Sequence, residues 1–284
     1  MAQAAPPMTM APMALDGPAD GPTDGPAQGR AAALRSTVAE ARQHDGQPAE
    51  AQPDAVTDAV MYDAVQAPAR EAVHLPINLS YPGVRALVLD PPIYEVDDFL
   101  TAAECDALID SAKDCMTPAP VVGAGNGEVS VSRTSSTCYL ARDDLPTVCT
   151  KVCALAGVPL AHLELPQVGR YRGTEFYKPH YDAFDTASAD GRRFAQNGGQ
   201  RVATVLIYLN DVPRGGETSF SRLGLRVRPA RGKALVFFPA TLAGALDTQY
   251  LHAAEPAVDS KWVSQVWIRQ KPYNGLASIR IAPI

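Results

Sequence analysis

Residues 201 to 209 read RVATVLIYL, a short run of apolar and β-branched residues that ends before Asn210. β-branched and aromatic residues favour strands, and a run of this length bounded by turn residues is typical of one. Other runs share this texture and the same Gly and Pro punctuation: Leu165 to Arg172, Phe176 to Asp182, Glu217 to Phe220, Gly224 to Arg228, Lys233 to Phe238, Gln249 to Ala253 and Lys261 to Arg269. The second half of the chain is therefore predicted to be a succession of strands.

Two helices are predicted ahead of these strands. Thr101-Ala-Ala-Glu104 has the Ser/Thr-x-x-Glu form of a capping box and opens the first. The second follows Asp143 or Asp144, with Pro146 in its first turn and Gly157 at its C-terminal cap. Helices followed by closely spaced strands favour a mainly β fold with flanking helices (α+β), in which the helices pack on one sheet of a sandwich or barrel. Periodicity alone does not separate a jelly roll from other sandwiches.

Composition divides the chain near residue 75. The sequence has 284 residues and is 46% hydrophobic, enough for one large domain or two small ones. Residues 1–75 hold nine prolines, a single aromatic residue (Tyr62) and the repetitive stretch DGPADGPTDGP. Such a segment cannot bury enough apolar surface to offset the entropy of ordering it. We therefore expect a disordered low-complexity tail rich in Ala, Pro, Gly and Asp over 1–75, and one folded domain over 76–284.

Charge follows the same division. Residues 1–75 contain ten acidic residues and four arginines, so the whole formal charge of −6 lies there, while residues 76–284 balance 21 bases against 21 acids. This balance argues against a nucleic-acid partner or an electrostatic membrane contact for the folded part. No apolar run approaches the roughly 18 residues of a membrane-spanning helix. Since neither a secretory signal nor a transit peptide is visible, we expect a cytoplasmic protein.

The cysteines give no strong signal. The five, at positions 105, 115, 138, 149 and 153, form an odd set without a C-x-x-C pair, which suggests neither a zinc knuckle nor a complete disulfide framework. Cys149 and Cys153 fall on one helical face and are interpreted as small buried hydrophobic residues. This interpretation fits a reducing compartment.

Two connections are long for hairpins. Met116 to Ser132 and Ala183 to Gln200 each carry three glycines. Loops of this size are usually functional lids or disordered. Both are therefore predicted to be mobile flaps.

The stretch FYKPHYDAFD, residues 176 to 185, places His180 and Asp182 two residues apart. In a strand, alternate side chains share a face, so this imidazole and carboxylate would face one ion. His252, at the end of a predicted strand 72 residues downstream, is the candidate third ligand. Two histidines and a carboxylate suit a non-haem Fe(II) oxygenase. A hydrolytic zinc site accepts the same ligands and is the competing hypothesis.

A lysine on the last predicted strand bears on this choice. An oxygenase with a dicarboxylate co-substrate needs a cation for the distal carboxylate, and Lys261 lies nine residues past His252. From about Pro92 to Gln270 the sequence closely resembles the prolyl 4-hydroxylase family of Fe(II)/2-oxoglutarate dioxygenases. The matching stretches are long and consecutive: IYEVDDFLTAAECDALI, VSRTSS, the block Tyr171 to Asp182, GGQRVATVLIYLNDVPRGGETSF, LRVRPARGKALVFFP, LHAAEP and KWVSQVWIR.

This resemblance implies a double-stranded β-helix (jelly roll) core and a set of site residues. The positions that match are His180, Asp182 and His252 for iron, and Lys261, Tyr171, Thr204 and Trp267 for 2-oxoglutarate. Core packing on predicted strands is the alternative explanation for the last three. Fe(II) is the implied cofactor and 2-oxoglutarate and O2 the implied co-substrates. Ascorbate is expected as well.

The implied reaction is 4-hydroxylation of prolyl residues in peptides or proteins, coupled to release of succinate and CO2. An extended, polyproline II-like segment would present its ring edges to a groove at low entropic cost. Tyr177, Arg133, Ser135 and Glu164 match peptide-facing positions, although an arginine at a strand or loop edge is more often a solvated surface residue. The alternatives are the same chemistry on another residue or a free amino acid, and a β-helix kept only as a binding module.

Three departures from the family pattern bear on peptide preference rather than on the metal chemistry. Family members usually have ten residues from the distal histidine to the lysine, whereas nine separate them here, so a tighter turn is expected at 257–260. Arg269 stands where hydroxylases of this group often carry histidine. Thr174 replaces a common glycine, with Gly173 beside it.

Overall fold

The computed structural model of the protein describes residues 73–119, 131–142 and 145–274. The predicted tail over 1–75 lies outside these residues except at its last three positions, so its disorder stays a prediction. Much of the predicted flap from Met116 to Ser132 also lies outside them. Within the described ranges, no helix has the length and apolar character needed to cross a membrane.

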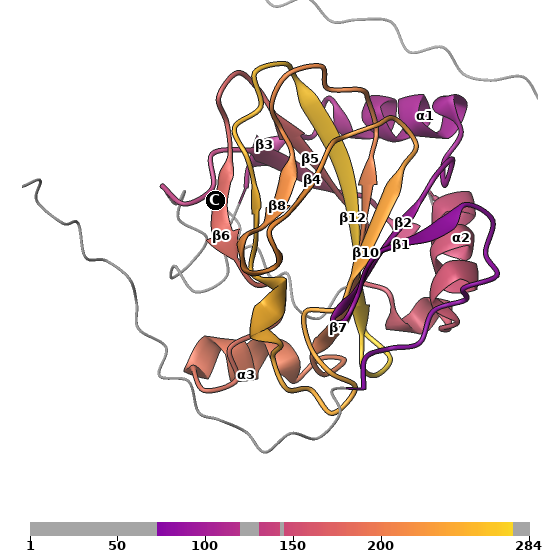
Figure 1. The fold of residues 1–284 in the computed structure, drawn as a ribbon, viewed down its shortest axis with the longest axis vertical. Helices are drawn as coiled ribbons and strands as arrows, with labels where there is room; N and C mark the ends of the chain where they lie inside the picture. Colours follow the sequence, from indigo (N-terminus) through magenta and orange to yellow (C-terminus); the bar gives the residue numbers. More distant parts are fainter. Residues whose placement is uncertain (1–72, 120–130, 143–144, 275–284) are drawn as a thin grey trace, which may run out of the picture. The chain divides into compact units, whose positions relative to one another are not determined.

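Antiparallel strands in two sheets form the core (Figure 1). The strands are β1 (Val84–Leu89), β2 (Pro92–Val96), β3 (Thr117–Pro118), β4 (Ser136–Tyr139), β5 (Gln167–Tyr171), β6 (Tyr177–His180), β7 (Arg201–Tyr208), β8 (Thr218–Phe220), β9 (Leu225–Val227), β10 (Ala234–Phe237), β11 (His252–Ala254) and β12 (Lys261–Arg269). The larger sheet has the order β1-β2-β10-β7-β12-β5-β4-β3, and the smaller has the order β6-β11-β8-β9. From β5 to β12 the chain passes back and forth between the two sheets, and the predicted mainly β jelly-roll fold is confirmed.

The run RVATVLIYL forms β7, between β10 and β12 in the larger sheet. Val202 to Tyr208 are all buried, which explains why this strand reads as a continuous apolar run rather than an alternating one. All eight predicted strands are present; the last, Lys261–Arg269, has the predicted ends and the others have shifted ends. The prediction for Gln249 to Ala253 is wrong in its first half, because a 3-10 turn (Thr248–Tyr250) precedes β11.

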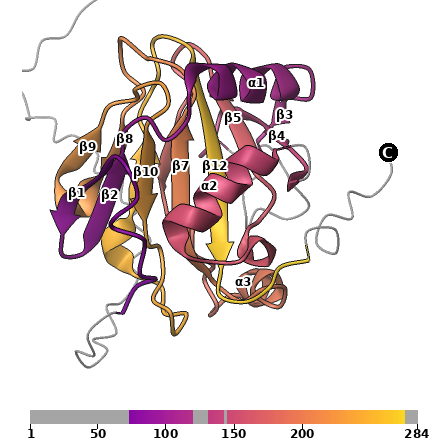
Figure 2. The ribbon, with the colours of Figure 1, turned by 90° about the vertical axis from the view of Figure 1, so that its right-hand side faces the viewer.

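The two predicted helices are α1 (Ala102–Ala112) and α2 (Pro146–Ala156), and both cover one face of the larger sheet (Figure 2). The capping box is formed: the Glu104 amide donates to the Thr101 hydroxyl at 3.2 Å, and the Thr101 amide donates to the Glu104 carboxylate at 2.7 Å. Lys151 of α2 donates to the same carboxylate at 2.7 Å and so ties the two helices together. Gly157 ends α2 with φ of +66°, as its position predicts.

The flap predicted over Ala183 to Gln200 is wrong in part, because it contains a helix, α3 (Ala189–Ala195), seen at the lower end of Figure 1. The Ser188 hydroxyl caps its first turn by accepting from the Gly191 amide at 2.9 Å. Its far end is tied to β12, where the Arg269 guanidinium donates to the carbonyl oxygens of Phe194 and Asn197. The glycines in this segment concealed a short helix.

A disulfide joins Cys115, just after α1, to Cys138 in β4. Cys105, Cys149 and Cys153 are not disulfide-bonded. Cys149 is buried as expected, whereas Cys153 is only half-buried, so its predicted burial is wrong in part. The cysteine spacing gave no sign of this pair, because its members lie 23 residues apart on different kinds of element.

Thr174 adopts φ of +66°, the left-handed region where a β-branched side chain is strained. Its amide donates to the Ala257 carbonyl at 2.7 Å. This bond holds the turn in its conformation although position 174 is a threonine and not a glycine. We expect Thr174→Gly to raise the free energy of unfolding by about 1 kcal/mol, since removing the Cβ relieves the strain and only part of the gain is lost to the freer unfolded chain. Urea denaturation measures the change. Thr174→Ala is the control, because it keeps a Cβ; an equal gain in both variants would contradict the explanation.

Candidate active site

Three potential metal ligands converge where the two sheets face each other. His180 ends β6, His252 opens β11, and the two residues lie directly opposite in the antiparallel register. Asp182 follows two residues after the end of β6, so its predicted place on that strand is wrong, yet its carboxylate still reaches both imidazoles. Its two oxygens lie 3.7 Å from His180 Nε2 and 3.8 Å from His252 Nε2. Ligand atoms of all three residues fall within 4.8 Å of one another.

The backbone orients both imidazoles. His180 Nδ1 lies 2.9 Å from the Lys178 carbonyl oxygen, and His252 Nδ1 lies 3.0 Å from that of Tyr250. A carbonyl oxygen only accepts, so each Nδ1 carries the proton and each Nε2 keeps its lone pair. Burial, with a contribution from the neighbouring His252, lowers the pKa of His180 to about 3. The imidazole is therefore neutral at physiological pH and ready to bind a metal.

The Asp182 carboxylate is held ionised in a buried position. Burial acts to raise its pKa, but attraction to the two imidazoles and to Arg201, together with the bond from Thr204, holds the pKa below its usual value. The Thr204 hydroxyl on β7 donates to Asp182 Oδ2 at 2.7 Å. This bond fixes the carboxylate and leaves its other oxygen facing His180.

Two residues that the sequence did not single out support the chain around Asp182. The Gln200 side chain holds the backbone of Phe184, two residues after Asp182. Its Oε1 accepts from the Phe184 amide at 2.7 Å, and its Nε2 donates to the Phe184 carbonyl at 2.9 Å. Arg201 Nη1 donates to the Asp182 carbonyl at 3.4 Å. Gln200 precedes β7 and Arg201 is its first residue, and their polar character at the start of an apolar strand was the only signal in the sequence.

Lys261 is a buried ammonium group without a carboxylate partner in the described part of the chain. It is 1% exposed, and its Nζ donates to the Gly216 carbonyl at 2.6 Å. Burial lowers its pKa to about 7, and only longer-range attraction to Glu217 and Glu255 acts against this. A buried cation without a counter-ion is costly, which points to an anionic ligand.

The other residues predicted for the co-substrate lie on the strands between this lysine and the triad. Tyr171 is opposite Lys261 in the β5–β12 register, with its ring centre 5.2 Å from Nζ. Trp267 is opposite Thr204 in the β12–β7 register, and its indole nitrogen has no hydrogen-bond partner among the described residues. The Thr204 hydroxyl is used by Asp182, so the predicted co-substrate contact of Thr204 stays a prediction.

Arg133, Ser135 and Tyr177 form a cluster beside the triad. Arg133 Nε donates to the Ser135 hydroxyl at 2.9 Å, and its Nη2 donates to Gln167 Oε1 at 3.0 Å. The guanidinium lies 4.8 Å from the centre of the Tyr177 ring, which in turn stacks on His180 at 3.5 Å. Arg133 is thus a buried, bonded residue and not the solvated surface arginine of the alternative interpretation.

Glu164 is held in an ion pair. Arg201 Nε and Nη2 donate to its two oxygens at 2.6 and 2.8 Å, and Arg269 Nε lies 3.5 Å from one of them. The same Arg201 guanidinium lies 3.8 Å from the centre of the Trp267 ring. The predicted peptide contact of Glu164 stays a prediction. What the structure adds is a pair of arginines, Arg201 and Arg269, beside it.

The donor set fits a divalent iron centre. Two imidazoles and one carboxylate can supply three ligands and leave positions open for a co-substrate, as in non-haem Fe(II) oxygenases. Zinc would accept these ligands too. However, a hydrolytic zinc site leaves the buried Lys261 without a purpose, whereas an anionic co-substrate gives it one.

Comparison with known sequences points to the same chemistry. The 2OG-Fe(II) oxygenase superfamily matches residues 166–269. Probable prolyl 4-hydroxylase 10 of Arabidopsis thaliana is 34% identical over 217 residues, which cover 67% of this chain and 73% of that protein. Prolyl 4-hydroxylase 1 of the same plant is 34% identical over 203 residues, 64% of this chain and 70% of that protein.

Among solved structures, a viral collagen prolyl hydroxylase from Paramecium bursaria Chlorella virus 1, in complex with 2-oxoglutarate, aligns with a TM-score of 0.48 and 26% identity. The alignment covers 62% of this chain and 95% of that one.

The bond from Thr204 to Asp182 predicts a loss of metal affinity when it is removed. We expect Thr204→Val to weaken binding of Mn(II), a redox-stable divalent ion, by about 10- to 100-fold, the usual effect of losing a partner of a metal ligand. Thr204→Ser keeps the hydroxyl and is the matched control. Isothermal titration calorimetry on metal-free protein measures both. Wild-type affinity in the valine variant would show that the bond does not position the carboxylate.

Proposed function

Because the chain belongs to the prolyl 4-hydroxylase family, we propose that it is an Fe(II)- and 2-oxoglutarate-dependent dioxygenase that hydroxylates prolyl residues at the 4-position in peptides or proteins. Succinate and CO2 are the co-products. The observation that carries this proposal is the pairing of a His-Asp-His triad with a buried ammonium group that lacks a counter-ion.

His180, Asp182 and His252 would hold the iron, and Lys261 would bind the distal carboxylate of 2-oxoglutarate. When bound, Fe(II) and 2-oxoglutarate supply the oxidising chemistry, in which O2 converts the oxo acid to succinate and CO2 and hydroxylates a substrate carbon. The protein's part is to hold three ligands in fixed protonation states and to keep water away. The Nδ1–H bonds of the two histidines and the Thr204 bond to Asp182 do the first. The buried rings of Tyr171 and Trp267 would do the second.

The Arg133 and Tyr177 cluster supports a peptide substrate. Tyr177 presents an aromatic ring beside a metal ligand, and together with His252 it lines a groove of about 380 Å³. Prolyl rings pack well on aromatic side chains, and an extended proline-rich segment loses little entropy on binding. Arg133 and Ser135 would then contact the peptide backbone. A free amino acid as substrate would leave most residues of this cluster without a contact to the substrate.

Ascorbate belongs to this proposal as an accessory reductant for the iron. Its test is whether succinate formation by Fe(II)-loaded protein declines sooner when ascorbate is omitted.

Coupled turnover tests the proposed function. Fe(II)-loaded protein with 2-oxoglutarate and ascorbate is given a proline-rich peptide, free proline or no substrate, and succinate is measured. We expect the peptide alone to raise succinate formation and to gain one oxygen per modified proline by mass spectrometry. Stimulation by free proline would favour the amino-acid alternative. No succinate under any condition would favour a non-catalytic binding module.

The lowered pKa of Lys261 predicts proton uptake on co-substrate binding. At pH 8 an ammonium group with a pKa of about 7 is mostly neutral. An anionic carboxylate favours the charged form and raises this pKa, so binding of 2-oxoglutarate draws a proton from solution. We expect uptake of about one proton at pH 8 and much less at pH 6, measured by calorimetry of Mn(II)-loaded protein in buffers of different ionisation enthalpy.

Two variants separate Lys261 from other titrating groups. Lys261→Arg keeps a permanent charge, so it should bind 2-oxoglutarate without taking up a proton. Lys261→Ala should weaken binding by about 100-fold or more, since removing one partner of a buried charge pair costs about 2–5 kcal/mol. Uptake that persists in the arginine variant would assign the proton to another group.

A further inference from the structure

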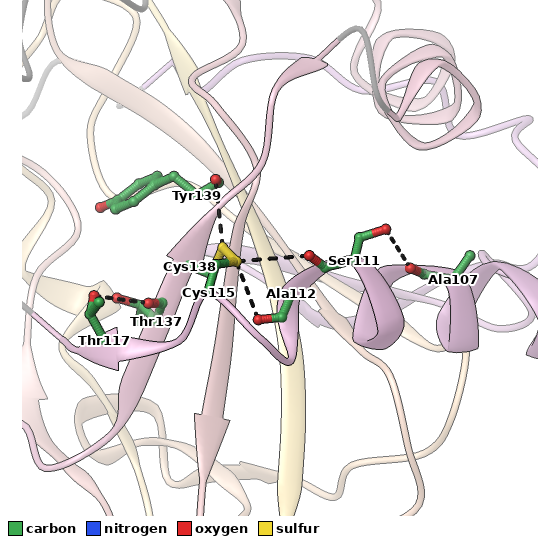
Figure 3. Close-up of a disulfide and its surroundings, with 8 residues drawn as sticks. All are labelled: Ala107, Ser111, Ala112, Cys115, Thr117, Thr137, Cys138 and Tyr139. Carbon is green, nitrogen blue, oxygen red and sulfur yellow. Dashed lines mark hydrogen bonds between the residues drawn. A yellow bond between two sulfur atoms is a disulfide. The ribbon is translucent and has the colours of Figure 1, made fainter. Parts of the chain in front are cut away.

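The disulfide between Cys115 and Cys138 lies next to the strand that leads to the predicted peptide-facing residues (Figure 3). Cys115 is exposed and follows the end of α1, whereas Cys138 is buried in β4. Figure 3 shows the sulfur pair bridging the end of the helix and this strand. Nothing in the iron or co-substrate site uses this bond.

Strand β4 reaches the metal centre through a short series of contacts. In the β4–β5 register, Thr137 is opposite Gly169 and Tyr139 is opposite Gln167. Gln167 accepts from Arg133, which precedes β4 by three residues and lies over the Tyr177 ring. Tyr177 stacks on the metal ligand His180. The position of β4 therefore sets the position of the cluster beside the iron site.

All four residues of β4 pair with β5, but its outer side has little support from the sheet. The strand has four residues and lies one place from the edge of the larger sheet, with only the two-residue β3 on its outer side. Within the described residues, the disulfide is the only covalent cross-link, and it joins this strand to the segment that follows α1. Such a tie restricts the conformations open to the segment it closes.

We propose that the Cys115–Cys138 disulfide is a positioning element of the peptide site, so that affinity for the peptide depends on its oxidation state. Intact, it holds β4 against α1 and keeps Arg133 and Ser135 in place. Broken, it releases the edge of the sheet, and the peptide binds less tightly. The iron and 2-oxoglutarate residues lie outside β4 and keep their arrangement. This inference rests on the proposed function.

The chemistry of the switch is thiol–disulfide exchange with a thiol or dithiol reductant. The reductant's thiolate attacks the exposed Sγ of Cys115, the Sγ–Sγ bond breaks, and Cys138 leaves as a thiolate that takes up a proton. A second thiolate of the reductant then releases Cys115, so two thiols become one disulfide while two cysteine thiols form. The Ala112 carbonyl oxygen, 3.3 Å from Cys115 Sγ, can accept from the new thiol.

The remaining cysteines do not interfere. Cys105 and Cys149 are buried and Cys153 is half-buried. Burial raises the pKa of both Cys105 and Cys153, which keeps these thiols protonated and slow to exchange. Cys115 is the exposed member of the set, so reductant acts there first.

The test compares oxidised protein, protein reduced with TCEP, and the variant Cys115→Ser. Each is loaded with Fe(II), and the KM values for a proline-rich peptide and for 2-oxoglutarate are measured. We expect reduction to raise the peptide KM by about tenfold, equivalent to about 1.4 kcal/mol. The 2-oxoglutarate KM and the peptide-independent succinate rate should stay the same. Cys115→Ser should match the reduced protein and no longer respond to TCEP, and Cys153→Ser, the matched control, should behave as wild type.

Three other results would contradict the positioning role of the disulfide. An equal peptide KM in oxidised and reduced protein overturns the positioning role, even where peptide hydroxylation itself is confirmed. A parallel rise in the 2-oxoglutarate KM with a lowered melting temperature also overturns it, because the disulfide then acts on the whole fold. Absence of peptide-stimulated turnover in every form refutes the proposed function and this inference with it.

Discussion

The hydrogen bond from Thr204 to Asp182 is the contact on which the site depends. It joins the centre of the larger sheet to the turn that follows β6 of the smaller one, at the point where the histidines meet. A buried carboxylate is unfavourable unless it is bonded and compensated. Here a hydroxyl, two imidazoles and the Arg201 guanidinium supply that compensation without forming a tight ion pair that would consume both oxygens. The carboxylate thus remains ionised and keeps lone pairs for a metal.

The charges of the interior fall into two kinds. Glu164 and Arg201 satisfy each other with two short bonds, and such a pair contributes order more than stability. Lys261 is different, since its only bonded partner in the described residues is a backbone carbonyl. Burial of this charge is unfavourable in the unliganded protein, and binding of an anion offsets that unfavourable free energy. The contrast separates a structural charge pair from a charge reserved for a ligand.

Sequence reasoning recovered what depends on local pattern. The spacing of His180 and Asp182 pointed to a shared site. The capping box at Thr101 gave the start of α1, and the glycine at 157 gave the end of α2. Pairing between strands distant in sequence was beyond it: that His252 lies opposite His180 is a matter of register between β11 and β6, which no local pattern encodes. The same reason hid the disulfide, the Arg201–Glu164 pair and the use of the Thr204 hydroxyl by Asp182. Three glycines made residues 183 to 200 look structureless, although a serine cap and the Arg269 guanidinium hold a helix there.

The two bonds between Gln200 and the backbone of Phe184 close the excursion that carries α3 at its base. Changes between these two residues are therefore not passed on to Asp182. The chain runs from Asp182 to Phe184, makes this excursion, and returns to Gln200 just before it enters β7. Closure entropy grows only slowly with length once the ends are fixed. Evolution or an engineer can thus lengthen, shorten or replace the α3 segment as a module without moving Asp182, the carboxylate proposed to hold the metal.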